Sequence, residues 1–187
     1  MKLPNILTLV RIFLIPVMIA FLYIDILKYY IYADLSYRYL ACLVIFCLAS
    51  FTDFLDGFIA RKYNMVTTFG KFADPLADKM LVFSALAILM VDSVVPVWVF
   101  IVMIVREFMV SGIRMLAAEK GQVIPAGLSG KLKTIVTMIA IIVMFLSGLH
   151  NIVYYVGQGL LYLACLLTII SGVEYFWKNR KTVLETI

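Results

Sequence analysis

Residues 53–78 read DFLDGFIARKYNMVTTFGKFADPLAD and place four aspartates inside a chain that is otherwise apolar. The four acids are Asp53, Asp56, Asp74 and Asp78. On helices, the first two lie three residues apart and the last two lie four apart, so each pair shares one face. Two such helices facing one another would bring all four carboxylates together. Charged groups in apolar surroundings are costly, so this cluster needs a partner.

The composition predicts a membrane protein. Hydrophobic residues make up 65% of the 187 residues, charged residues only 14%, and the mean hydropathy is +1.07. Soluble domains are far more polar. A spanning helix needs about 20 mostly apolar residues, and six stretches qualify, near 5–24, 37–60, 70–91, 94–117, 131–149 and 152–176. We therefore expect one all-α, polytopic integral membrane domain over residues 1–187, with six transmembrane helices.

The four aspartates favour a metal site. Like charges repel unless cations lie between them. Carboxylate oxygens without a nearby histidine or cysteine favour Mg²⁺ or Mn²⁺ over zinc. Two ions about 3.5–4 Å apart would use four carboxylates well. The competing interpretation is structural: single aspartates cap helices or pair with the nearby cations, which are Arg61, Lys62, Lys71 and Lys79.

Small residues and an arginine accompany the acids. Gly57 follows Asp56, and Gly70 lies four residues before Asp74, so neither position blocks the acid face with a side chain. Ala60 leaves similar room for a phosphate. Arg61 supplies a planar guanidinium that suits phosphate oxygens.

These residues follow the spacing D-x-x-D-G-x-x-A-R, eight residues, G-x-x-x-D-x-x-x-D. The pattern resembles that of the CDP-alcohol phosphotransferase family, and every specified position is filled. The resemblance implies that family's fold, a homodimer, and a membrane enzyme in which an alcohol attacks the pyrophosphate of a CDP-linked lipid and CMP is released. It also implies that Asp53, Asp56 and Asp74 hold two Mg²⁺ or Mn²⁺ ions. Asp78 would be a metal ligand, a general base, or both.

The amino-terminal segment PNILTLVRIFLIP resembles that of bacterial members of the family. The resemblance implies that Asn5, Thr8 and Arg11 lie near the nucleotide of the CDP-lipid, together with Asp53, Gly57, Ala60, Arg61 and Gly70. The alternative is that Asn5 and Thr8 cap a helix. Arg11 would then reach out to lipid phosphate.

A second polar region covers residues 105–134, VREFMVSGIRMLAAEKGQVIPAGLSGKLKT. Adjacent residues of a helix do not face each other, so we expect Arg106 and Glu107 to have different partners. Arg106, Arg114, Lys131 and Lys133 are expected to bind the phosphate of an anionic acceptor. The alternative is that they mark topology or form interhelical pairs.

This second region resembles the matching segment of bacterial members that use glycerol 3-phosphate. The expected reaction is transfer of the phosphatidyl group of CDP-diacylglycerol to glycerol 3-phosphate, giving phosphatidylglycerophosphate and CMP. The same chemistry with phosphatidylglycerol, giving cardiolipin, or with an inositol phosphate stays open as an alternative. A cation transporter is the alternative from another class, but transporters tend to place acids near the bilayer midplane and across several helices.

Positive charge predicts the orientation. Most Lys and Arg residues fall at the two termini and in the second and fourth connections, whereas Lys28 and Arg38 lie on the opposite side. By the positive-inside rule, both termini and the aspartate cluster face the cytoplasm of a cell-membrane protein. We expect membrane lipids, and no nucleic acid, as further partners.

Overall fold

The protein is described by a computed structural model that covers residues 3–32, 34–62, 68–119 and 127–180. Within these ranges the description leaves out the side chains of residues 3, 4, 54, 56–62, 68, 69, 71 and 72. The side chains of Asp56, Gly57, Ala60 and Arg61, which the sequence places in the candidate site, therefore lie outside the described part of the molecule.

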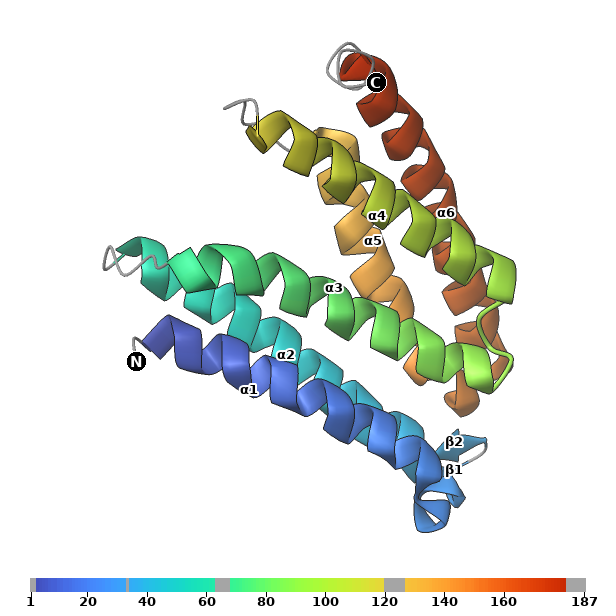
Figure 1. Cartoon of the computed structure of the whole chain (residues 1–187). Coiled ribbons are helices and arrows are strands. Elements are labelled where there is room, and N and C mark those ends of the chain that lie inside the picture. Colours follow the sequence, from blue (N-terminus) through green and yellow to red (C-terminus); the bar gives the residue numbers. More distant parts are fainter. Residues whose placement is uncertain (1–2, 33, 63–67, 120–126, 181–187) are drawn as a thin grey trace.

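Long helices dominate the described ranges (Figure 1). They are α1 (Leu3–Ala20), α2 (Tyr37–Lys62), α3 (Thr68–Val91), α4 (Val97–Glu119), α5 (Leu128–Phe145) and α6 (Asn151–Lys178). The shorter elements are η1 (Phe21–Tyr23), η2 (Asp25–Lys28), β1 (Tyr30–Tyr32), β2 (Leu35–Ser36) and η3 (Ser147–Leu149). β1 and β2 pair antiparallel, and Tyr30 lies opposite Ser36.

Each long helix coincides with one of the six predicted apolar stretches, so the helical prediction is confirmed for the described ranges, with the short β1–β2 hairpin as an exception. The start of α4 differs from the prediction, because α4 begins at Val97 and not near residue 94. The cause is a turn after α3, in which Ser93 has a left-handed φ of 60° and the Val94 amide donates to the Leu89 carbonyl at 2.9 Å. A left-handed residue after the last turn is a common helix terminator.

Three helical segments in the described ranges are long and apolar enough to cross a membrane, namely Asn5–Tyr23, Leu128–Leu149 and Asn151–Arg180. These segments cover most of α1 and all of α5 and α6. The remaining long helices, α2, α3 and α4, each carry more charged residues than α1, α5 or α6, which lowers their mean hydropathy. The apolar helices make this a helical membrane protein.

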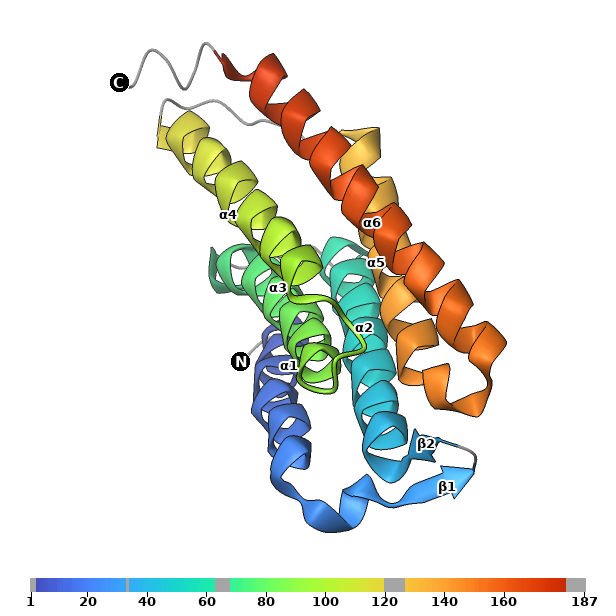
Figure 2. The ribbon, with the colours of Figure 1, turned by 90° about the vertical axis from the view of Figure 1, so that its right-hand side faces the viewer.

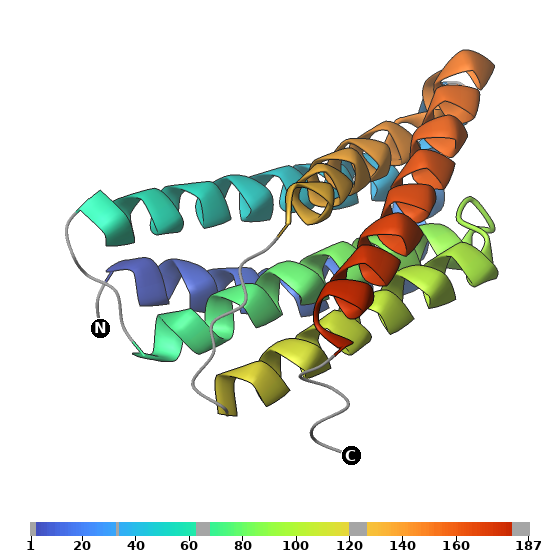
Figure 3. The same ribbon diagram turned by 90° about the horizontal axis from the view of Figure 1, so that it is seen from above.

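The long helices run alternately up and down, so the first turns of α1, α3 and α5 and the last turns of α2, α4 and α6 lie toward one end of the bundle (Figures 1 and 3). α1 packs against α2 and α3, and α6 packs against α4 and α5. The β1–β2 hairpin lies at the opposite end (Figure 2). It is tied to η3 because the Asp34 amide donates to the Gly148 carbonyl at 3.0 Å.

One apolar core joins the group α1, α2 and α3 to the group α4, α5 and α6. Its fully buried side chains include Met18, Phe46, Leu86, Met144 and Leu161, from five different helices. α5 and α6 approach each other at Gly157, where a Cβ atom would lie 2.9 Å from Sδ of Met144. This packing leaves the polar residues of α2, α3 and α4 to gather toward the end where α2 ends and α3 begins.

Candidate active site

Three of the four aspartates are described, and two of them contact α1. Thr8 Oγ1 donates a hydrogen bond to Asp74 Oδ1 at 2.5 Å, and Arg11 Nη1 lies 2.7 Å from Asp53 Oδ1. Thr8 and Arg11 are three residues apart, so they share one face of α1. That face meets α2 and α3 at these two aspartates.

Arg11 is a buried cation beside the aspartates. Its side chain is fully buried, and its Nε also donates to the Ala49 carbonyl on α2 at 3.3 Å. The alternative that Arg11 reaches out to lipid phosphate is therefore wrong. A buried guanidinium needs a fixed anion because desolvation of an unpaired charge is costly, and Asp53 supplies that anion.

The described carboxylates interact with one another. Asp53 lies within electrostatic range of Asp74, and Asp78 lies within such range of Asp53 and Arg11. In the part of the chain whose side chains are described, no group of three Asp, Glu, His or Cys residues is close enough to hold a metal ion. The predicted fourth ligand, Asp56, lies outside that part. Asn5 is half-buried on α1 and Gly70 is buried on α3.

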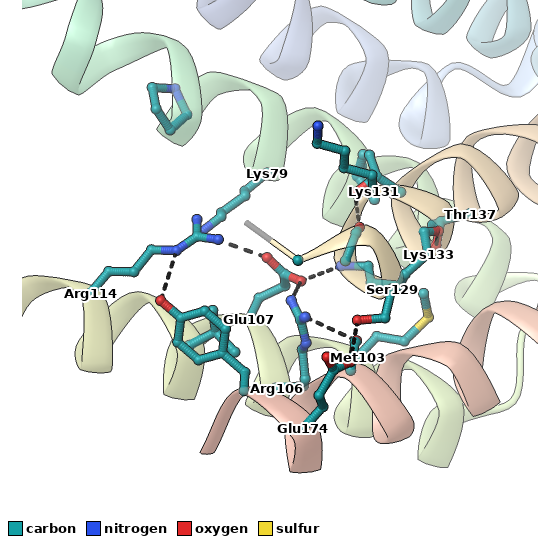
Figure 4. A pocket seen from close by; sticks show the side chains of 18 of the residues that line it. Lys79, Met103, Arg106, Glu107, Arg114, Ser129, Lys131, Lys133, Thr137 and Glu174 are labelled. Carbon is teal, nitrogen blue, oxygen red and sulfur yellow. Dashed lines mark hydrogen bonds and ion pairs between the residues drawn. The ribbon is translucent and has the colours of Figure 1, made fainter. Parts of the chain in front are cut away.

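A cavity of about 750 Å³ adjoins the acids, between α3, α4, α5 and α6 (Figure 4). Asp78 lines it, so this aspartate belongs both to the acidic cluster and to the cavity wall. Cations outnumber acids among its described charged lining residues, which are Asp78, Lys79, Arg106, Glu107, Arg114, Lys131, Lys133, Glu174 and Lys178. The cavity therefore favours an anion.

All four residues predicted to bind the acceptor phosphate line this one cavity. Lys133 is buried and Lys131 is exposed. Within the described part of the chain, Lys131 forms no ion pair. The Arg114 Nε donates to the Tyr175 hydroxyl at 3.3 Å, and its guanidinium carbon lies 5.5 Å from the centre of that ring.

Glu107 lies at the centre of the cation group (Figure 4). Lys133 Nζ donates to its Oε1 in a short contact. Arg106 Nη1 donates to the same oxygen at 2.7 Å, and Lys79 Nζ lies 3.7 Å from Oε2. The expectation that Arg106 and Glu107 have different partners is wrong, because the long arginine side chain bends back so that its Nη1 reaches the adjacent carboxylate. Arg106 also has a second partner, since its Nη2 donates to Ser171 Oγ at 2.9 Å.

The contribution of α6 is absent from the sequence-based prediction. Ser171, Glu174, Tyr175 and Lys178 all line the cavity, and Ser129 Oγ donates to Glu174 Oε2 at 2.7 Å. The signal was present, because these residues recur at positions i, i+3, i+4 and i+7 of an otherwise apolar helix, which places them on one face.

Comparison with known proteins identifies relatives over nearly the whole chain. Residues 1–170 match the family described as CDP-alcohol phosphatidyltransferase. The chain is 42% identical over 187 residues to the "CDP-diacylglycerol--glycerol-3-phosphate 3-phosphatidyltransferase" of Bacillus subtilis, covering 95% of each protein. It is 44% identical to the protein of that name from Rickettsia bellii, covering 96% of each. It is also 40% identical to a "Probable phosphatidylglycerophosphate synthase" of Mycobacterium tuberculosis, covering 93% of this chain and 79% of the relative.

Proposed function

The chain belongs to the CDP-alcohol phosphatidyltransferase family, and from this membership we propose that it transfers the phosphatidyl group of CDP-diacylglycerol to glycerol 3-phosphate. The products are phosphatidylglycerophosphate and CMP. The observation that carries the choice of acceptor is the similarity, over nearly the full length, to two relatives named as glycerol-3-phosphate 3-phosphatidyltransferases, at 42% and 44% identity. The cationic cavity beside Asp78 supports it, since glycerol 3-phosphate is a small dianion.

The bond changes follow from this assignment. A hydroxyl oxygen of glycerol 3-phosphate attacks the phosphorus that carries diacylglycerol. A new oxygen–phosphorus bond forms, the bond from that phosphorus to the bridging oxygen breaks, and CMP leaves. Asp78 is the proposed base that takes the hydroxyl proton, because it lies where the acidic cluster meets the acceptor cavity. Most of the rate gain would come from positioning and charge neutralisation.

We propose that a pair of divalent cations binds at Asp53, Asp56, Asp74 and Asp78. Asp53, Asp74 and Asp78 offer hard carboxylate oxygens within electrostatic range of one another, and such oxygens suit Mg²⁺ or Mn²⁺. With Asp56, these residues would hold the ions. When bound, the ions would supply charge neutralisation at the pyrophosphate of the lipid substrate. Asn5, Thr8, Arg11, Gly57, Ala60, Arg61 and Gly70 are the proposed residues around the CDP group.

Arg106, Arg114, Lys131 and Lys133 are the proposed residues for the acceptor phosphate. They come from two helices, α4 and α5, and line one cavity. Their positive charges compete with the metal site for the phosphate of glycerol 3-phosphate. This competition would leave the acceptor hydroxyl free to turn toward Asp78.

An acceptor scan tests the assignment. Purified full-length protein would receive CDP-diacylglycerol, Mg²⁺ and, in separate reactions, glycerol 3-phosphate, phosphatidylglycerol or inositol phosphate, with CMP release as the readout. We expect CMP with glycerol 3-phosphate. Release of CMP only in the reaction with phosphatidylglycerol would instead identify a cardiolipin synthase. Uptake of divalent ions into liposomes with no CMP release under any condition would favour a transporter.

We further propose six membrane spans, with both termini and the active site on the cytoplasmic side of the cell membrane. The distribution of Lys and Arg supports this orientation, and α1 begins and α6 ends toward the same end of the bundle (Figure 1). Single cysteines replacing Lys28 and Lys178 in a variant without native cysteines would test it. In intact cells, a membrane-impermeant maleimide should label position 28 and spare position 178.

The homodimer is proposed from the family resemblance alone. Its test is the mass of the purified protein in detergent, measured by light scattering after subtraction of the bound detergent. A mass of two chains is the expected result.

A further inference from the structure

The carboxylate of Glu107 is shared by cations from three helices. Lys79 comes from α3, Arg106 from α4 and Lys133 from α5, and all three lie within ion-pair distance of it. The Glu107 side chain is only 14% exposed, and those of Arg106 and Lys133 are 11% and 10% exposed. Water screens buried charges weakly, so these contacts are stronger than ion pairs on a surface.

The contacts leave most of the hydrogen-bond donors of these cations unused. A lysine ammonium has three donors and a guanidinium has five. Lys133 gives one donor to Glu107, and Arg106 gives one to Glu107 and another to Ser171. Arg106 Nε is buried and has no hydrogen-bond partner in the described part of the molecule. The cations thus remain able to bind a second anion in the cavity.

Without the carboxylate, this arrangement would not persist. Lys79, Arg106 and Lys133 would repel one another, and a buried ammonium without an anion either moves toward water or loses its proton. In either case a fixed positive charge leaves the cavity wall. Removal of one partner from a buried ion pair is costly for this reason.

We propose that Glu107 is a positioning residue of the acceptor site. Its carboxylate holds Lys133 and Arg106 charged and in place, and their remaining donors bind the phosphate of the acceptor. Glu107 itself does not contact the reacting atoms. This inference rests on the proposed function and adds to it the residue that sets the affinity for the phosphorylated acceptor.

Steady-state kinetics of the full-length protein in detergent test the proposal. Glu107→Gln keeps the shape of the side chain and removes its charge. We expect the KM for glycerol 3-phosphate to rise about ten-fold, as for the loss of one charge-assisted contact to the phosphate. The KM for CDP-diacylglycerol should change less than about two-fold, because Arg11 and the aspartates are untouched. Glu107→Asp, which keeps the charge on a shorter side chain, should give an intermediate KM.

A double-mutant cycle separates positioning from a general structural effect. Because Glu107 also holds Arg106, adding Glu107→Gln to Lys133→Gln should raise the KM for glycerol 3-phosphate further, but by a smaller factor than Glu107→Gln raises it in the wild-type protein. Glu119→Gln is the matched control, since Glu119 is exposed near the end of the same helix and outside the cavity lining. An unchanged or lower KM in folded Glu107→Gln, or additive effects in the cycle, would overturn the proposal.

A binding measurement distinguishes failure of this inference from failure of the proposed function. Inorganic phosphate should raise the unfolding temperature of the wild-type protein in detergent by binding the folded state. Glu107→Gln should need about ten-fold more phosphate for the same shift. Absence of CMP release by the wild-type protein refutes the proposed acceptor, whereas an equal phosphate dependence of the two proteins refutes the role of Glu107.

Discussion

Arg11 Nη1 lies 2.7 Å from Asp53 Oδ1, which joins the first helix to the second through a fully buried guanidinium. Three residues earlier on α1, Thr8 donates to Asp74 on α3. The amino-terminal helix therefore forms one wall of the aspartate cluster. Sequence motifs place the acids on α2 and α3, but the orientation of two of these carboxylates depends on α1.

Arg11→Gln should impair both stability and catalysis. The change leaves the Asp53 carboxylate without its cation, at a cost of about 1–2 kcal/mol in the free energy of unfolding, less than for a fully buried pair because the Asp53 side chain is 37% exposed. Thermal unfolding in detergent and CMP release are the measurements. The control is Arg180→Gln, because Arg180 is exposed and its guanidinium carbon lies 4.7 Å from the centre of the Trp177 ring. Equal behaviour of the two variants would contradict the structural role of Arg11.

Asp78→Asn should insert and fold normally yet release CMP at least about a hundred-fold more slowly, as expected for loss of a general base. The substitution keeps the shape of the side chain and removes its ability to take a proton. CMP release under saturating substrates is the readout, with the unfolding temperature as the check on folding. Asp25→Asn, at an exposed site in η2, is the control. Retention of full activity would remove Asp78 from the mechanism.

Removal of divalent cations should abolish CMP release. The carboxylates of Asp53, Asp74 and Asp78 repel one another, and a divalent cation offsets that repulsion. We expect EDTA to reduce activity to background, and excess Mg²⁺ or Mn²⁺ to restore it. EDTA should also lower the unfolding temperature, since ions that bind the folded state stabilise it. Full activity in EDTA would contradict the metal assignment.

Gly172→Ala should weaken binding of glycerol 3-phosphate. A Cβ atom at Gly172 would lie 3.0 Å from Cγ of Arg106, so the arginine side chain would have to give by a few tenths of an ångström, which disturbs its contacts with Ser171 and Glu107. We expect the KM for glycerol 3-phosphate to rise several-fold, by about 1 kcal/mol or more in binding free energy. An unchanged KM would show that Arg106 can shift without affecting the acceptor.

The matched control for this change is Gly159→Ala, on the same helix. Among the residues that the structure describes, no atom of a neighbouring element lies within 4 Å of its added Cβ. Alanine favours a helix over glycine by about 0.5–1 kcal/mol. The Gly159 variant should therefore be as stable as the wild-type protein or more stable, with an unchanged KM.

The helices and the acidic motif were predictable because both are local properties of the chain. Runs of about 20 apolar residues mark helices whatever they pack against, and the spacing of Asp74 and Asp78 places them on one face of any helix. The start of α4 was missed by three residues because Val94 and Val95 are apolar yet belong to a turn. Hydropathy alone does not distinguish these two situations.

The partners of the charged residues were much less predictable. Arg106 and Glu107 were expected to have different partners. They contact each other because both side chains reach into one cavity. The polar face of α6 was overlooked because its residues carry no motif and acquire a common role only when α6 packs against α4 and α5.

From the amino-acid order alone follow the membrane class, the six long helices of the described ranges and the types of residue available for metal and phosphate binding. Helix packing adds which of these residues meet across helices: Arg11 with Asp53, and Glu107 with Lys133. The physical reason is range. Hydropathy and helical periodicity act over a few turns of one helix, whereas ion pairs between helices depend on contacts between segments tens of residues apart.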